Sequence, residues 1–260
     1  MSYIHATILG IVEGLTEFLP ISSTAHLILA SDLMHLVQSE FNKSFEIIIQ
    51  MGAILSVVFL YYKDLFKWSM IKKLFVAFVP TAIIGLLLYK FIKGYLIGNT
   101  VVVLWTLALG GILLIVFERV FAKRIALNES EDSSLSEISY KQSFVVGLFQ
   151  SLAVIPGVSR SAATIIGGML WGVKRKAIVE FSFLLAVPTM VAATGLDIYK
   201  NMNAFTHSDW KVLSVGLIVS FITAILAIKF FIAYIQKNTF SAFGWYRILL
   251  VIIFAIIFFG

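Results

Sequence analysis

Six predominantly apolar runs of about 20 residues dominate the sequence, at about 45–62, 74–91, 100–118, 178–199, 212–236 and 241–259. A run of this length matches the ~30 Å hydrocarbon core of a bilayer. Because backbone groups in lipid must be hydrogen-bonded within the chain, we expect these runs to be helices. A hydrophobic content of 60% and a charged content of 13% are typical of the same class. The sequence therefore predicts an all-α polytopic membrane protein with about six full transmembrane helices.

Two further apolar segments, at about 5–33 and 143–172, are interrupted near the middle, the first by Pro20 and the second by Pro156 and Gly157. Proline lacks a backbone donor and disfavours a continuous helix at that point. Each half of a broken segment is too short to cross the bilayer. Both segments are therefore predicted to be re-entrant helix-loop-helix elements.

The two halves of the chain repeat one plan, because each broken segment is followed by three apolar runs. The sequence GIVE at 10–13 is echoed by GLFQ at 147–150, and SST at 22–24 is echoed by SRS at 159–161, at the same offset. Three spans per half is an odd number, so the second copy must enter the membrane from the opposite face. This pattern predicts an inverted-topology repeat.

We expect one integral membrane domain, 1–260, with repeats at about 1–122 and 142–260 joined by a polar loop at 123–141. Lysine and arginine are concentrated in this loop and in others on the same side, which predicts that this side is cytoplasmic. Both termini and the opening of the first broken segment should then face the exterior, while the second segment opens to the cytoplasm and reaches the same depth. The net charge of +6 is assigned to loops on anionic lipid and indicates no nucleic-acid binding.

Polar residues are concentrated within the first broken segment, in the stretch Glu13–Leu27, which reads EGLTEFLPISSTAHL. A carboxylate at bilayer depth is costly and indicates a functional site. Glu13 and Glu17 are four residues apart, so in a helix they share one face and repel each other. A hard divalent cation, which prefers oxygen ligands, would relieve that repulsion.

Hydroxyl groups and a histidine follow the two carboxylates. Pro20 ends the helix, and Ser22, Ser23 and Thr24 offer N-cap hydroxyls to a new one. His26 follows Ser22 by four residues and Ser23 by three, within reach of both across one helical turn. This short stretch can therefore supply a metal site, a nucleophile and a proton carrier.

A second motif, PGVSRSAAT at 156–164, lies at the interruption of the second broken segment. Arg160 is the only basic residue inside that apolar segment, and Ser159, Ser161 and Thr164 surround it. The motif falls where a half-helix should begin, and a helix N-terminus attracts anions. The planar fork of arginine suits phosphate oxygens. If the two interruptions meet near the membrane midplane, the combination suits a phosphate or diphosphate carried by a lipid.

The stretches EGLTEFLPISSTAH and PGVSRSAAT closely resemble the two signature regions of the bacterial undecaprenyl-diphosphate phosphatase family, which is linked to bacitracin resistance. The resemblance continues through FEIIIQMGAIL from Phe45 and EFSFLLAVPT from Glu180. It implies removal of one phosphate from undecaprenyl diphosphate, outside the cytoplasmic membrane, to give undecaprenyl phosphate and inorganic phosphate and so recycle the carrier lipid for peptidoglycan synthesis. It also implies a divalent cation, Mg²⁺ or Ca²⁺. Ala25 and Ala162 stand where glycine is common in the family.

The resemblance carries roles over to individual residues. Metal binding falls to Glu13 and Glu17, and the catalytic set is Glu17, Ser23, His26 and Arg160. The residues expected to bind the substrate phosphate are Ser22, Thr24, Ser159, Arg160, Ser161 and Thr164. Ser23 is the preferred nucleophile, with His26 as its base, while attack by water or by His26 itself stays open.

The alternative function is a carrier that moves a phosphorylated polyprenyl lipid or a small anion across the membrane, since inverted repeats with broken helices are typical of transporters. The combination of Ser23 and His26 beside two carboxylates favours the enzyme, because transport needs no nucleophile. Glu46 and Gln50 either line the cavity or hydrogen-bond across helices. Expected partners are the polyprenyl diphosphate substrate and membrane lipids, and small-residue contacts permit a homodimer without requiring one.

Overall fold

The computed structural model describes residues 1–37, 39–91, 100–128, 134–201 and 207–259 of the chain. Within these ranges every regular element is an α-helix or a short 3-10 helix. Five helices are long and apolar enough to cross a membrane: α3 (Glu40–Leu65), α4 (Trp68–Phe91), α5 (Thr100–Asn128), α8 (Arg175–Asn201) and α9 (His207–Ile235). The prediction of an all-helical, multi-spanning membrane protein is therefore confirmed.

The sixth predicted span is the helix α10 (Ser241–Phe259), which has 19 residues and an apolar stretch described for Ser241–Ile257. Among the residues that the structure describes, five helices thus meet the length of a span, and α10 is a shorter apolar helix. The helix α5 also runs further than the apolar pattern suggested, to Asn128, so the predicted polar loop at 123–141 begins inside a helix. Helix formation needs backbone hydrogen bonds but no apolar surroundings, which is why hydropathy misplaced this end.

Both broken segments form pairs of short helices. The first pair is α1 (Tyr3–Thr16) and α2 (Ser23–Leu33). The second pair is α6 (Tyr140–Gln150) and α7 (Arg160–Leu170), with the 3-10 helix η3 (Ser151–Val154) between them. We call residues 17–22 the first break and residues 155–159 the second break.

Each break contains proline and one residue with a left-handed backbone. Pro20 lies in the first break, where Ser22 has φ 71°. In the second break Pro156 is followed by Gly157, with φ 85°. Positive φ is uncommon outside glycine, so Ser22 holds a strained conformation at the start of α2. The chain therefore turns sharply at the two places where the sequence predicted interruptions.

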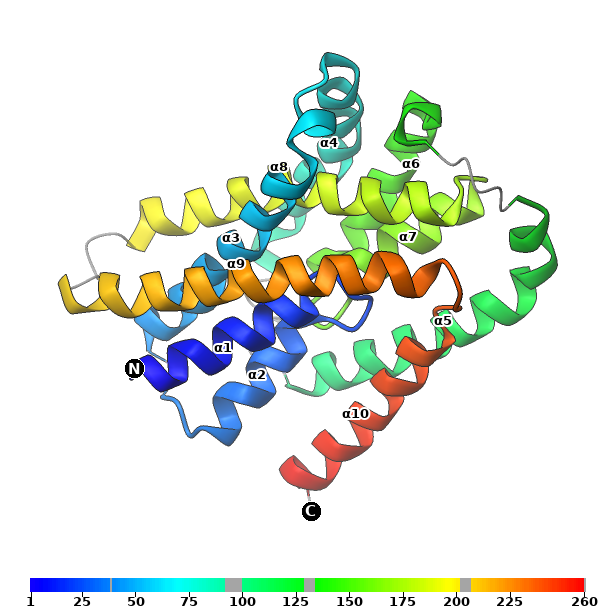
Figure 1. Cartoon of the computed structure of the whole chain (residues 1–260). Helices are drawn as coiled ribbons and strands as arrows, with labels where there is room; N and C mark the ends of the chain where they lie inside the picture. The colour runs from blue at the N-terminus through cyan, green and yellow to red at the C-terminus, as the bar shows by residue number, and fades with distance from the viewer. Residues whose placement is uncertain (38, 92–99, 129–133, 202–206, 260) are drawn as a thin grey trace.

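Helices from the two halves of the chain interlock (Figure 1). The helix α1 packs along α9, and α6, the first helix of the second pair, packs along α4. Close approach of α6 and α4 requires glycine, since a Cβ atom on Gly147 would lie 2.0 Å from the carbonyl oxygen of Ala77. The helices α3 and α8 pack against each other, as do α5 and α10. The two breaks are thus enclosed by helices of both halves.

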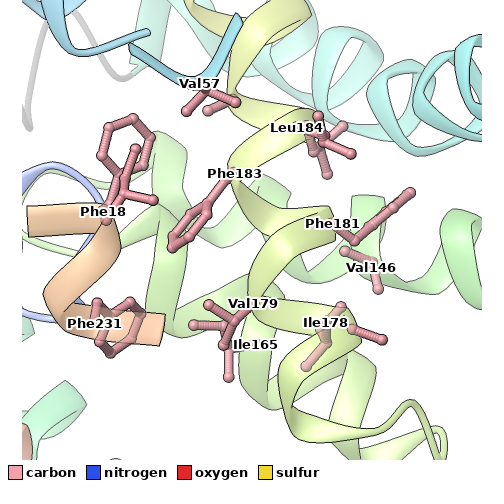
Figure 2. Packing of buried hydrophobic residues seen from close by; sticks show 14 of the residues in the cluster. Phe18, Val57, Val146, Ile165, Ile178, Val179, Phe181, Phe183, Leu184 and Phe231 are labelled. Carbon is pink, nitrogen blue, oxygen red and sulfur yellow. The ribbon is translucent and has the colours of Figure 1, made fainter. Parts of the chain in front are cut away.

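A cluster of buried aromatic and aliphatic side chains fixes the first break to α8 and α9 (Figure 2). Phe18, in the first break, makes an edge-to-face contact with Phe183 of α8, with ring centroids 5.2 Å apart. Phe231 of α9 also contacts Phe183, with ring centroids 6.1 Å apart. Because Phe18 follows Glu17 and Phe183 follows Ser182, this packing also fixes the polar side chains next to them.

Candidate active site

Glu17 lies at the centre of the polar contacts between the two breaks. Its Oε2 accepts a hydrogen bond from the Ser23 hydroxyl at 2.5 Å. Its Oε1 forms an ion pair with Nη2 of Arg160 at 3.3 Å, although 143 residues separate the two in the sequence. All three side chains are buried. The structure therefore brings the acidic motif, the serine and the arginine of the second motif into one site.

Arg160 is the first residue of α7, so it projects from the start of the helix toward the first break. Its Nη1 donates to the backbone carbonyl of Ser182 at 2.7 Å, which leaves Nη2 for Glu17. Packing of α7 against α8 thus orients the guanidinium. A buried arginine paired with one carboxylate, at a helix N-terminus, is well suited to attract a further anion.

One hydroxyl of the second motif connects α7 to the first break, and the other two form bonds to α8 and within α7. Ser161 donates to the backbone carbonyl of Phe18 at 2.8 Å, and Thr164 lies 2.6 Å from the Ser182 hydroxyl. Ser159 is the N-cap of α7, and its hydroxyl accepts from the backbone N–H of Ala162 at 3.2 Å. The three hydroxyls of the second motif that were predicted to bind phosphate therefore all make hydrogen bonds within the protein.

The hydroxyls of the first motif lie differently from one another. Ser22 occupies the N-cap position of α2, but its side chain makes no capping hydrogen bond, contrary to expectation, because its φ of 71° departs from the usual N-cap geometry. Ser23 is buried against Glu17, whereas Thr24 is exposed.

His26 contacts groups other than the serine hydroxyls. Its Nδ1 hydrogen-bonds the backbone carbonyl of Ser22 at 2.8 Å, and its Nε2 hydrogen-bonds the hydroxyl of Tyr246 at 2.8 Å. The rings of His26 and Tyr246 are parallel, with centroids 5.5 Å apart. The group against the Ser23 hydroxyl is therefore the Glu17 carboxylate, and not the imidazole.

Glu13 is fully buried, and neither of its carboxylate oxygens has a hydrogen-bond partner in the described part of the chain. The Glu17 carboxyl group is near enough to share a proton with it, but two ionised carboxylates would repel, and Glu46 and Arg160 also lie within electrostatic range. A buried carboxylate without a partner is costly, so the donor set fits a hard cation. Among the described residues, no three His, Asp or Glu side chains lie close enough together to hold one metal ion. The remaining ligands would thus have to be backbone, water or substrate oxygens, which Mg²⁺ commonly retains.

Glu46 accepts a hydrogen bond from the Ser31 hydroxyl at 2.7 Å. This contact joins α3 to α2. It agrees with the interpretation that Glu46 hydrogen-bonds across helices. Gln50, one turn further along α3, is half-buried.

Sequence reasoning missed Ser182, Tyr246 and Arg247. Ser182 and Tyr246 give no local signal, because their importance depends on partners far away in the sequence. Arg247 did give one, since it is a basic residue inside a strongly apolar run, the feature that drew attention to Arg160.

A multi-spanning helical protein that buries a carboxylate, a serine and an arginine together at two helix breaks has a site suited to anionic ligands within the membrane. The comparison with known families is specific. The family described as Bacitracin resistance protein BacA matches residues 6–253, and the chain belongs to this family. The predicted family is thereby confirmed.

Curated relatives are similar along almost the whole chain. The undecaprenyl-diphosphatase of Sulfurihydrogenibium sp. (strain YO3AOP1) is 51% identical over 255 residues, covering 98% of this chain and 98% of the relative. The undecaprenyl-diphosphatase of Aquifex aeolicus is 49% identical, again with 98% of each chain covered. That of Bdellovibrio bacteriovorus is 49% identical, over 96% of this chain and 94% of the relative.

Proposed function

We propose that this protein hydrolyses undecaprenyl diphosphate to undecaprenyl phosphate and inorganic phosphate, at the outer face of the bacterial cytoplasmic membrane. Relatives that carry the name of this activity are about half identical to the chain over nearly its full length. The observation that carries the proposal is the contact of one carboxylate, Glu17, with both Ser23 and Arg160. Phosphoryl transfer by way of a covalent phosphoserine requires a nucleophile, a proton acceptor and a positively charged side chain that binds the phosphate.

In the first step, Ser23 Oγ attacks the terminal phosphorus and its proton passes to Glu17 Oε2, to which it is hydrogen-bonded. The bond between that phosphorus and the bridging oxygen breaks, and undecaprenyl phosphate leaves with the electron pair. Water then displaces Ser23 Oγ from phosphorus, the proton held by Glu17 returns to Oγ, and the phosphate keeps both protons of the water. This assigns to Glu17 the role of base that the sequence suggested for His26.

Arg160 holds the terminal phosphoryl group in this proposal. Its ion pair with Glu17 is 3.3 Å long and involves one guanidinium nitrogen, so a bound phosphate can compete for the fork. Arg160 binds more strongly as negative charge develops on the phosphoryl oxygens. His26, fixed by Tyr246 and by the Ser22 carbonyl, orients the start of α2.

Glu13 and Glu17 would hold the divalent cation, Mg²⁺ or Ca²⁺. When bound, such a cation neutralises phosphate oxygens and the leaving group. The unpartnered carboxylate of Glu13 supports this assignment.

We also propose that the two broken segments are re-entrant and that the halves are related as an inverted repeat. Support comes from the packing, because the first helix of each broken segment packs on a long helix of the other half. The helix α1 packs on α9, and α6 packs on α4. Hydroxyls on those two partner helices, Thr223 and Thr81, donate to the backbone carbonyls of Gly10 and Gly147, which occupy matching positions in the repeats. A homodimer stays a prediction.

The test is phosphate release from undecaprenyl diphosphate by purified protein in detergent with Mg²⁺. We expect turnover by the wild-type chain and none above background with Arg160→Ala. A carrier would need a gradient or two compartments, and detergent provides neither. A folded, monodisperse wild-type protein without phosphate release would contradict the enzyme proposal and favour the carrier.

A further inference from the structure

Arg247 is a large, fully buried charged side chain that the proposed chemistry does not use. It lies on α10, inside an apolar helix, and only 1% of its surface is exposed. Its Nε donates to the backbone carbonyl of Leu107 at 3.2 Å, and its Nη2 to that of Thr106 at 3.0 Å, both on α5. Among the described residues no carboxylate forms an ion pair with it. Burying a charged side chain that is bonded only to carbonyl oxygens costs free energy. Burial of Arg247 therefore indicates a structural or functional role.

The other two hydrogen bonds of Arg247 reach the two breaks. Its Nη1 donates to the carbonyl of Pro20 at 3.5 Å, and its Nη2 donates to the carbonyl of Gly157 at 3.3 Å. Pro20 lies three residues before Ser23, and Gly157 lies three residues before Arg160. One guanidinium thus contacts both breaks. In each break the contacted carbonyl lies three residues before a residue that is proposed to act on phosphate.

Pro20 and Gly157 are equivalent positions of the two repeats. The offset that aligns Gly10 with Gly147 also aligns Pro20 with Gly157 and Ser23 with Arg160. The guanidinium therefore bridges corresponding carbonyls of the two halves. A planar cation with several donors in fixed directions can make such a bridge, whereas a lysine ammonium offers only a point charge.

The helix α5 is shaped to receive this side chain. A Cβ atom on Gly110 would lie 2.3 Å from Nη2 and 2.6 Å from Cζ of Arg247, so only glycine leaves room for the guanidinium. Thr106, one turn earlier, also donates through its hydroxyl to the carbonyl of Pro156 in the second break, at 2.8 Å. The helices α5 and α10 together thus hold the second break through side chain and backbone.

We propose that Arg247 is a positioning residue, which fixes the two breaks relative to each other so that Ser23 and Arg160 face the same phosphate group. This inference rests on the proposed hydrolase function. Small displacements between a nucleophile and a bound phosphate have large effects on the rate of the chemical step. Removing the bridge should therefore lower kcat more than it changes KM.

The experiment compares Arg247→Lys and Gly110→Ala with the control Arg175→Lys, using undecaprenyl diphosphate in detergent with Mg²⁺. Arg175 is also a buried arginine, but it pairs with Glu118 away from both breaks. For Arg247→Lys we expect kcat to fall about 10-fold or more per folded molecule, with KM within about 3-fold of wild type. The control should lose thermal stability while keeping kcat within about 2-fold of wild type.

An Arg247→Lys variant whose kcat matches that of the control would overturn the inference, as would a loss confined to KM, which would indicate contact with substrate. If Arg247→Lys does not fold, Gly110→Ala decides, because it keeps the charge but displaces the guanidinium. A 10-fold lower kcat in Gly110→Ala supports the positioning role, and an unchanged kcat excludes it. A folded wild type without hydrolysis would contradict the proposed function itself, whereas an active wild type with an unimpaired Arg247→Lys contradicts only this inference.

Discussion

At the scale of single residues, Glu17 connects the two motifs through its two oxygens. One oxygen accepts the Ser23 proton and the other faces Arg160. Its negative charge balances the buried guanidinium and at the same time makes the serine hydroxyl more nucleophilic. A neutral amide of the same shape could do neither, although it would fill the same space.

Replacement of Glu17 by glutamine should therefore lower kcat by a factor of about 10² to 10⁴, the range typical of losing a general base. Phosphate release from undecaprenyl diphosphate measures the effect. The matched control is Glu137→Gln, which removes an exposed carboxylate paired with Lys174 at 3.2 Å and should leave the rate within about 2-fold. A Glu17→Gln enzyme that retains more than a tenth of wild-type kcat would exclude Glu17 as the proton acceptor.

Glu13 differs from Glu17 because it is fully buried without a hydrogen-bond partner among the described residues. Glu13→Gln should raise the Mg²⁺ concentration needed for half-maximal stabilisation by about 10-fold or more. In the absence of metal the same variant should melt at an equal or higher temperature than wild type, since the repulsion between the neighbouring Glu13 and Glu17 carboxyl groups is removed. Thermal unfolding at increasing Mg²⁺ measures both effects.

The control is Glu46→Gln, because the Glu46 carboxylate already accepts a hydrogen bond from Ser31. A Glu13→Gln protein with unchanged Mg²⁺ dependence would show that the cation binds elsewhere.

At the scale of elements, the packing of α6 against α4 determines where the second motif lies. A Cβ on Gly147 would meet the backbone of Ala77 at 2.0 Å, which no side-chain movement can relieve. Gly147→Ala should therefore cost about 1–3 kcal/mol, as overpacking does, and lower the melting temperature. Gly85→Ala, on α4, is the control, because a Cβ there meets nothing within 4 Å. Equal melting temperatures for the two variants would contradict the close approach of α6 and α4.

The sequence predicted the helices and the two breaks because these follow from local properties. Apolar length determines which segments suit a bilayer, and Pro20 and Pro156 interrupt a helix wherever they occur. The neighbours of each site residue were not predictable in the same way. Whether Ser23 bonds to Glu17 or to His26 depends on the turn at Ser22, and the partner of His26 is Tyr246, 220 residues away. Tertiary packing determines such contacts, and a single sequence has no local pattern that predicts them.

At the scale of the whole molecule, the proposed orientation puts the α2–α3 turn outside and the segment before α6 inside the cell. The chain has no cysteine, so a single introduced cysteine reports on one position without background. Val37, between α2 and α3, is 79% exposed, and Ser134, before the 3-10 helix η2 (Leu135–Glu137), is also exposed. Both residues therefore suit labelling with a membrane-impermeant maleimide.

We expect Val37→Cys to react in intact cells and Ser134→Cys to react only after permeabilisation, because basic loops face the cytoplasm. Each variant serves as the control for the other, since both side chains are accessible and the membrane alone distinguishes them. The reverse pattern would put the opening of the first break on the cytoplasmic side. The substrate would then have to be hydrolysed before it reached the exterior, and the proposed recycling at the outer face would be wrong. Reaction of both variants in intact cells would instead place the two loops on one side, which an odd number of crossings between them does not allow.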